Sequence, residues 1–296
     1  MELGVALDRA AAELAVAGVP SPRADAELLA AHLLHVSRPE IVRRALLGGT
    51  DVPGGYDELV AERARRVPLQ HLTGRAPFRD LDLAVGPGVF VPRPETEEVA
   101  GIAIDAARAA VASTGRALVV DLCTGSGAIA LAVATEVPKA TVVAVEVSVD
   151  ARAWAQANIA ALAPGRVDLR AADVTTPAAL RVLADLLGQV DVVAGNPPYI
   201  PPGQEPVDPE VRDHDPPVAL YGLGPDGLTV PRGFILLAAR LLRPGGRMVM
   251  EHADVQGAAS VAAVAAGGGW YDVEDHLDLS GRPRYVTATR AGAAPA

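Results

Sequence analysis

Residues 117–127 read ALVVDLCTGSG, and this stretch decides the fold. The apolar run from Ala117 to Leu122 predicts a buried strand, and the glycine-rich turn from Cys123 to Gly127 opens a helix-forming segment. Glycines allow the backbone to turn sharply and approach a ligand, which then faces the N–H groups at the start of the helix. The stretch predicts a ligand-binding turn, although a tight turn with a capping Thr or Ser would give the same pattern.

The alternation of strand and helix continues toward the C-terminus. Further apolar runs rich in β-branched residues cover 141–145, 167–170, 190–194 and 247–250. Because helical stretches separate them, they predict a doubly wound parallel sheet. Two last runs, 270–273 and 284–289, have no helix between them and are expected to close one edge antiparallel. We therefore expect an α/β, Rossmann-like fold with a mostly parallel seven-stranded sheet.

The first 75 residues follow a different pattern. From residue 3 to about residue 66, apolar side chains recur three and four positions apart, which predicts amphipathic helices. Glycine, serine and proline interrupt this pattern at residues 18–22, 37–39 and 48–55. We expect residues 1–75 to form a separate domain, a small bundle of about four helices.

Residues 76–92 are expected to connect two domains. The sequence alternates over 78–85, turns at Gly86 to Gly88 and continues over 89–91, which predicts a β-hairpin. The remaining residues, 93–296, are expected to form the second domain, which contains the predicted sheet.

The second domain contains one long segment without a regular pattern, from Asn196 to about Pro231. Loops of this length inside compact domains are usually functional or disordered. This segment follows a predicted central strand, and ligands bind beyond the carboxyl ends of such strands. Its position therefore favours a functional role.

Charge and composition exclude several classes of protein. The formal net charge is −10, with 36 acidic and 26 basic side chains, so nucleic acid is a disfavoured partner. The single cysteine forbids an intramolecular disulfide, and the six histidines lack the spacing of a metal site. The start of the chain does not resemble a signal peptide, and no apolar stretch approaches the roughly 20 residues that span a bilayer. We expect a cytoplasmic protein with no membrane partner.

The sequence contains one short basic run. The arginines Arg63, Arg65 and Arg66 are interpreted as a solvated helix face rather than as a contact with a partner.

Glu146 ends the strand that follows the glycine turn, about 20 residues further on, where an acid can accept both hydroxyls of a ribose. A solvated acid at a strand end is the alternative. Together with the turn, Glu146 indicates a cofactor that contains adenosine.

The sequence Asn196-Pro197-Pro198-Tyr199, directly after the predicted strand 190–194, indicates the chemistry. An amide nitrogen is a poor nucleophile because its lone pair is delocalised into the carbonyl. The Asn196 side-chain oxygen and the Pro197 carbonyl can each accept one N–H of a planar amide and aim its lone pair at an incoming methyl group. The prolines fix the backbone without competing donors, and Tyr199 can stack on the amide.

These motifs resemble those of the protein-(glutamine-N5) methyltransferases that modify peptide chain release factors. The segments that carry the resemblance are VPRPETE (91–97), DLCTGSGAIA (121–130), GNPPYI (195–200), EVRDHDP (210–216) and GRPRYV (281–286). The resemblance implies a class I S-adenosylmethionine-dependent methyltransferase whose helical domain recognises the protein substrate. Its expected acceptor is the glutamine of the Gly-Gly-Gln loop in bacterial release factors.

The resemblance also assigns roles to individual residues. The expected cofactor contacts are Cys123, Thr124, Gly125, Ser126, Gly127, Glu146, Asp173, Val174 and Asn196. The expected substrate contacts are Asn196, Pro197, Pro198 and Tyr199, of which Asn196, Pro197 and Tyr199 are expected to be catalytic. The chain departs from the family twice, because the family usually has Gly at the position of Cys123 and commonly has Asp at the position of Glu146. Both departures bear on cofactor affinity.

Three other functions compete with this interpretation. A methyltransferase acting on an exocyclic amine of a nucleic acid base would use the same loop, but it would need a basic surface, which the net charge does not favour. A non-catalytic nucleotide-binding protein on the same fold would not require Asn-Pro-Pro-Tyr. A dehydrogenase would not need that loop for hydride transfer.

Overall fold

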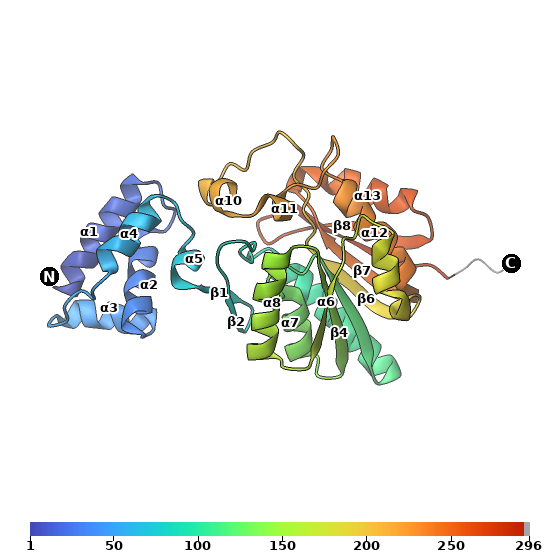
Figure 1. Cartoon of the computed structure of the whole chain (residues 1–296), viewed down its shortest axis with the longest axis horizontal. Helices are drawn as coiled ribbons and strands as arrows, with labels where there is room; N and C mark the ends of the chain where they lie inside the picture. The colour runs from blue at the N-terminus through green and yellow to red at the C-terminus, as the bar shows by residue number, and fades with distance from the viewer. Residues whose placement is uncertain (293–296) are drawn as a thin grey trace. The chain divides into compact units, whose positions relative to one another are not determined.

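The computed structural model describes residues 1–292, which divide into two compact units (Figure 1). The first unit comprises Met1–Arg75 together with Glu205–His214, and the second comprises Ala76–Gln204 and the chain from Asp215 onward. Within residues 1–292, no helix is both long and apolar enough to span a bilayer.

The first unit is built around α1 (Leu3–Val16), α2 (Pro22–Leu34), α3 (Arg38–Leu47), α4 (Tyr56–Ala64) and α5 (Leu69–Thr73). Glycine, serine and proline separate the helices where the pattern is interrupted, and the Ser37 hydroxyl accepts the Glu40 N–H at the start of α3. The core is apolar, and its largest fully buried side chains include Leu3, Leu7, Leu14, Leu29, Ile41 and Tyr56. The Tyr56 hydroxyl donates to the Ala26 carbonyl at 3.0 Å and so ties α4 to α2.

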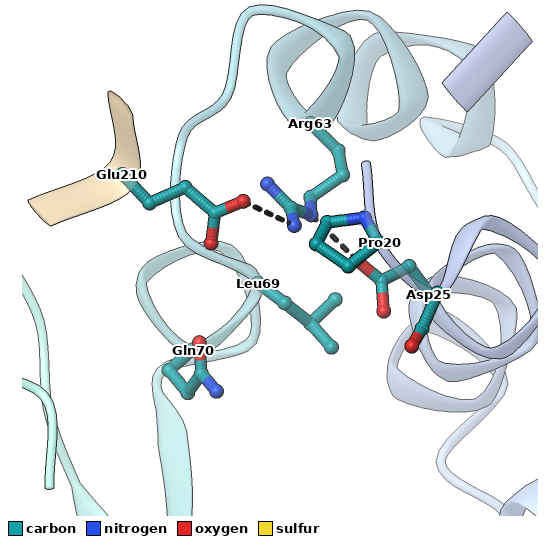
Figure 2. A pocket seen from close by; sticks show the side chains of 7 residues that line it. Pro20, Asp25, Arg63, Leu69, Gln70 and Glu210 are labelled. Carbon is teal, nitrogen blue, oxygen red and sulfur yellow. Dashed lines mark hydrogen bonds and ion pairs between the residues drawn. The ribbon is translucent and has the colours of Figure 1, made fainter. Parts of the chain in front are cut away.

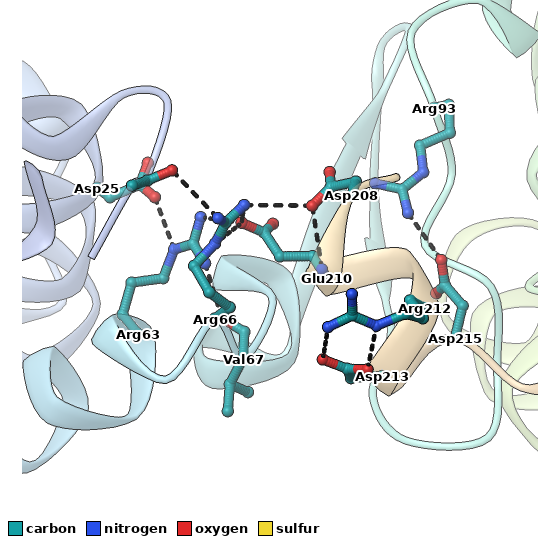
Figure 3. Close-up of polar contacts among 11 residues, drawn as sticks. Asp25, Arg63, Arg66, Val67, Arg93, Asp208, Glu210, Arg212, Asp213 and Asp215 are labelled. Carbon is teal, nitrogen blue, oxygen red and sulfur yellow. Dashed lines mark hydrogen bonds and ion pairs between the residues drawn. The ribbon is translucent and has the colours of Figure 1, made fainter. Parts of the chain in front are cut away.

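Residues 205–214, which include α10 (Pro209–His214), belong to the first unit although they lie far along the chain. Figure 3 shows how arginines hold this segment. Arg63 donates to Glu210 at 2.7 Å, and Arg66 donates to both Glu210 (3.0 Å) and Asp208 (3.2 Å). The chain re-enters the second unit at Asp215. Periodicity in the sequence cannot reveal this contact, because Arg63 and Glu210 are 147 residues apart in sequence.

The interpretation of the arginine run as a solvated face is wrong for two of its three members. The Arg63 side chain is only 4% exposed, and it also donates to Asp25 at 2.7 Å. Helix α4 ends at Ala64 and Arg66 has a left-handed φ of 66°, so the chain turns and both arginines reach Glu210. Only Arg65 remains exposed.

A small pocket of about 140 Å³ lies beside Arg63 (Figure 2). Its lining comprises Pro20, Ser21, Asp25, Arg63, Leu69, Gln70 and Glu210. The charged groups of this pocket already pair with one another, and none of the predicted site residues lines it. We therefore place the functional site elsewhere.

The second unit contains the predicted sheet. Its seven described strands are β3 (Ala117–Leu122), β4 (Ala140–Glu146), β5 (Val167–Ala171), β6 (Val190–Gly195), β7 (Leu242–Glu251), β8 (Trp270–Leu277) and β9 (Pro283–Arg290). They are ordered β5-β4-β3-β6-β7-β9-β8. The pairs from β5 to β7 are parallel, whereas β9 is antiparallel to both of its neighbours. The predicted α/β fold and its antiparallel edge are confirmed.

Helices cover both faces of this sheet (Figure 1). One core joins the sheet to α6 (Thr96–Thr114), α7 (Ala128–Glu136) and α8 (Val149–Leu162). The other joins it to α9 (Ala178–Val182), α12 (Thr229–Leu241) and α13 (Gly257–Ala266). The central strands are buried on both faces, which explains why their sequences are continuously apolar rather than alternating.

The hairpin lies a few residues earlier than predicted. Its strands are β1 (Arg75–Phe78) and β2 (Leu81–Ala84), so the turn is at Arg79 and Asp80 and not at Gly86 to Gly88. Arg79 has a left-handed φ of 52°, which its other contacts support. Its N–H donates to Glu97 at 3.0 Å, and its guanidinium donates to Glu136 at 2.6 Å. These long-range contacts favour a turn that the local sequence does not indicate.

The long segment after Asn196 is more ordered than its sequence indicates. It contains α10 and α11 (Pro217–Leu220), and α12 already begins at Thr229. The prolines explain why the sequence shows no regular pattern here, because proline interrupts long helices and strands. They also permit short helices, because proline is well tolerated in the first turn of a helix, where its missing N–H would have no partner.

Candidate functional site

The site lies where the strand order changes direction. From β3 the chain continues to β4 and β5 on one side, and later to β6 and β7 on the other side. Because these strands are parallel, the turn after β3, Glu146 at the end of β4 and Asn196 after β6 all lie at the same edge. Ligands of open α/β sheets bind at such a switch point.

The glycine turn leaves open space at its centre. Gly125 has a left-handed φ of 57°, and a β-carbon added there would have no atom within 4 Å. The Thr124 N–H donates to the Val145 carbonyl at 3.0 Å, which fixes the turn against β4. Cys123 has a left-handed φ of 61°, a conformation that is strained for a residue with a β-carbon. Glycine would adopt this conformation without strain.

Asp121 is a further candidate site residue, which the sequence motifs alone did not single out. It is fully buried, and its Oδ2 accepts hydrogen bonds from the Thr124 hydroxyl and from the Ala130 N–H. Its Oδ1 is buried without a partner. Burial raises the pKa of Asp121 to about 7, although both hydrogen bonds oppose this shift. A buried acceptor without a donor is costly, so this oxygen suits a cationic ligand group. The available signal was an acid inside an otherwise apolar strand.

Glu146 is not a solvated strand-end acid, because only 8% of its surface is exposed. Its Oε2 accepts the Gly125 N–H at 2.9 Å, and its Oε1 accepts the Ser148 N–H at 2.9 Å. Each carboxylate oxygen can accept more than one hydrogen bond. The carboxylate thus supports the glycine turn and retains the capacity to bind hydroxyl groups.

Two further predicted cofactor contacts follow β5, which pairs in parallel with β4. Val174 is buried, and the Asp173 carboxylate accepts hydrogen bonds from the N–H and the hydroxyl of Thr175. The structure therefore places Asp173 and Val174 beyond the carboxyl end of β5, on the same edge as Glu146.

The Asn-Pro-Pro-Tyr loop is held by several polar contacts. A β-carbon at Gly195 would lie 2.1 Å from the Leu122 carbonyl oxygen, so only glycine lets β6 approach β3 here. Asn196 Nδ2 donates to the Thr96 hydroxyl at 3.3 Å. The Tyr199 hydroxyl donates to Glu251 at 3.4 Å, and its carbonyl accepts from Gln256 at 2.9 Å.

The two prolines of this loop differ in burial, and a buried acid, Glu251 at the end of β7, lies beside the loop. Pro197 is buried and Pro198 is partly exposed. Glu251 is 2% exposed, and burial raises its pKa to about 7, although hydrogen bonding from Thr96 and the charge of Arg284 oppose the shift. Neither Thr96 nor Glu251 was predicted to belong to the site.

Two parts of the chain match known family models. Residues 104–208 match the family model of the methyltransferase small domain, and residues 5–74 match that of the PrmC N-terminal domain. Together with the sheet order, these matches show a class I, Rossmann-like methyltransferase with a helical N-terminal region.

Relatives are similar along almost the whole chain. The release factor glutamine methyltransferase of Streptomyces coelicolor is 54% identical over 96% of both chains. That of Mycolicibacterium smegmatis is 49% identical over 97% of this chain and 98% of its own. That of Mycobacterium tuberculosis is 47% identical over 100% of this chain and 94% of its own. The chain belongs to the release factor glutamine methyltransferase family.

Proposed function

We propose that the chain transfers a methyl group from S-adenosylmethionine to the side-chain nitrogen of the glutamine in the Gly-Gly-Gln loop of release factors. The observation that carries this proposal is the orientation of Asn196, whose Nδ2 is engaged by Thr96. Its Oδ1 is then left to accept an N–H from an acceptor amide. The names of the relatives support the release factor as substrate.

The residues at the carboxyl edge of the sheet fit this cofactor, which supplies a methyl group on an activated sulfonium. The Asp121 oxygen without a partner suits its ammonium group, and the open face of Gly125 admits its methionine end. Glu146 would accept the ribose hydroxyls. The other proposed contacts are Cys123, Thr124, Ser126, Gly127, Asp173, Val174 and Asn196.

In the proposed reaction, the chain mainly holds and aims the acceptor amide. Asn196 Oδ1 and the Pro197 carbonyl each accept one N–H, and Pro198 stiffens the loop. Tyr199 positions the plane of the amide. Such alignment supplies much of the catalysis when the leaving group is already activated.

We also propose that the protein acts in the cytoplasm and that its domains have different roles. Residues 1–75 would recognise the body of the release factor, residues 76–92 would connect, and residues 93–296 would transfer the methyl group. The structure adds residues 205–214 to the first unit. A truncation after residue 75 would therefore leave Asp208 and Glu210 without their arginine partners.

Methyl transfer onto purified substrates tests the proposed function. A release factor should accept the methyl group of labelled S-adenosylmethionine, whereas the same factor with alanine in place of the loop glutamine should not. Nucleic acid with exposed exocyclic amines is the parallel arm. Labelling of nucleic acid but not of the release factor would favour the alternative methyltransferase.

Replacing Cys123 with glycine is expected to stabilise the protein. The change relieves a left-handed φ that costs roughly 1–2 kcal/mol in a residue with a β-carbon, less the backbone entropy that glycine loses on folding. Cys123→Ala is the matched control, because it removes the thiol but keeps the β-carbon. We expect thermal unfolding of the glycine variant at a higher temperature than that of the alanine variant. Equal midpoints would show that Cys123 is not strained.

Cofactor affinity is expected to rise with pH as Asp121 ionises. Its pKa of about 7 in the free protein means that, at lower pH, binding a cation must first remove a proton. Each pH unit below the pKa then costs about 1.4 kcal/mol, up to tenfold in affinity. The affinity is measured by calorimetry between about pH 5.5 and 7, because the cofactor ammonium stays protonated over this range. In Asp121→Asn this dependence should vanish; an unchanged slope would exclude Asp121 as its source.

A further inference from the structure

A buried chain of hydrogen bonds joins Asn196 to an acid that lies outside the substrate loop. Asn196 Nδ2 donates to the Thr96 hydroxyl at 3.3 Å, and that hydroxyl donates to Glu251 Oε2 at 2.7 Å. The other oxygen of Glu251 accepts from the Tyr199 hydroxyl at 3.4 Å. One carboxylate therefore contacts Tyr199 directly and Asn196 through a single hydroxyl.

The donors and acceptors in this chain can be counted. A threonine hydroxyl has one hydrogen, and at 2.7 Å a carboxylate takes it in a strong, charge-assisted bond. Thr96 can then only accept from Asn196, which must turn its NH₂ group toward Thr96. The two ends of an asparagine amide have nearly the same shape, so packing alone does not choose between them. The Glu251 carboxylate determines the orientation of the Asn196 amide, because it binds the only hydrogen of the Thr96 hydroxyl.

We infer that Glu251 and Thr96 are positioning residues that set which end of the Asn196 amide faces the substrate. This inference rests on the proposed function, in which Asn196 Oδ1 accepts an N–H of the acceptor glutamine. With the amide reversed, its NH₂ group would face the substrate N–H, and two donors would oppose each other. The acceptor would then lose both its hydrogen bond and its alignment.

The fold keeps this chain of hydrogen bonds rigid. Thr96 is the first residue of α6, and Glu251 is the last residue of β7, which pairs in parallel with β6. Both side chains are buried, at 5% and 2% exposed. Arg284 lies near Glu251 and favours its charged form, whereas Glu95 opposes it. The Gln256 side chain donates to the carbonyls of Tyr199 and Asp226 and holds the far end of the loop.

The test removes the hydroxyl without changing the shape of the side chain. Thr96→Val should lower kcat for release factor methylation on the order of 10²-fold, because Asn196 loses the contact that orients it. Thr96→Ser, which keeps the hydroxyl, should restore most of the rate. Cofactor affinity, measured by calorimetry, should fall far less than kcat in both variants, because Thr96 contacts Asn196 alone among the proposed cofactor contacts.

Two further variants sharpen the test. Glu251→Gln can donate to Thr96, which lets Thr96 donate to Asn196 and reverses the amide, so kcat should again fall on the order of 10²-fold. Thr114→Val is the matched control, because Thr114 lies at the other end of α6 and its hydroxyl donates to a nearby backbone carbonyl, that of Ala110 or that of Arg116. It should retain normal kcat. Assays at about pH 8 keep Glu251 ionised.

The outcomes separate this inference from the proposed function. If Thr96→Val is folded and retains normal kcat while Asn196→Ala loses activity, the positioning role is overturned and the proposed function stands. A uniform loss of kcat and cofactor affinity without rescue by serine would also overturn it, because it would indicate a purely structural role. Absence of release factor methylation by the unmodified protein would instead contradict the proposed function. Thermal unfolding of each variant confirms that it is folded.

Discussion

Replacing Asn196 with alanine is expected to lower the rate of methyl transfer by on the order of 10²-fold or more, while cofactor binding should remain measurable. Asn196 would hold one N–H of the acceptor amide, and without it the nitrogen lone pair is no longer aimed at the methyl group. Single-turnover assays with a release factor measure the transfer step directly.

The control for this variant removes another side-chain amide. Gln189 is exposed and precedes β6, at the opposite end of the strand from Asn196. Gln189→Ala should transfer methyl groups at the normal rate. Near-normal turnover of folded Asn196→Ala would contradict the proposed role of the loop.

Replacing Glu146 with alanine should weaken cofactor binding by roughly 1.5–3 kcal/mol, or about 10- to 150-fold, the cost of losing hydrogen bonds to a charged group. Glu146→Asp should lose less, because it keeps the carboxylate. Calorimetry with S-adenosylmethionine gives the affinity.

The structure adds a control for Glu146, because its carboxylate also holds the Gly125 and Ser148 N–H groups. Thermal unfolding must therefore show that the alanine variant remains folded. Glu13→Ala, which removes an exposed acid from the first unit, should leave affinity unchanged. Unchanged affinity in Glu146→Ala would mean that this acid supports only the turn.

The sequence predicts the second unit well because its signals are local. Each central strand is a short apolar run, and the turn residues that follow it are adjacent in sequence. Parallel pairing then brings the turn after β3, Glu146 and Asn196 to one edge. This is why a few motifs were enough to locate the candidate site.

What the sequence does not predict depends on contacts between distant residues. Thr96 lies 155 positions from Glu251 and 100 from Asn196, and no periodicity reports such a pairing. Glu210 lies 147 positions from Arg63, so the sequence could not predict that residues 205–214 belong to the first unit. The hairpin turn at Arg79 likewise depends on Glu97 and Glu136.

Mass spectrometry of release factors from cells with and without this protein tests the central claim most directly. The account predicts that the peptide containing the Gly-Gly-Gln loop carries one methyl group on its glutamine side chain, and that the methyl group is absent in cells lacking the protein. A methylated glutamine in cells that lack the protein and any second enzyme of this family would contradict the account.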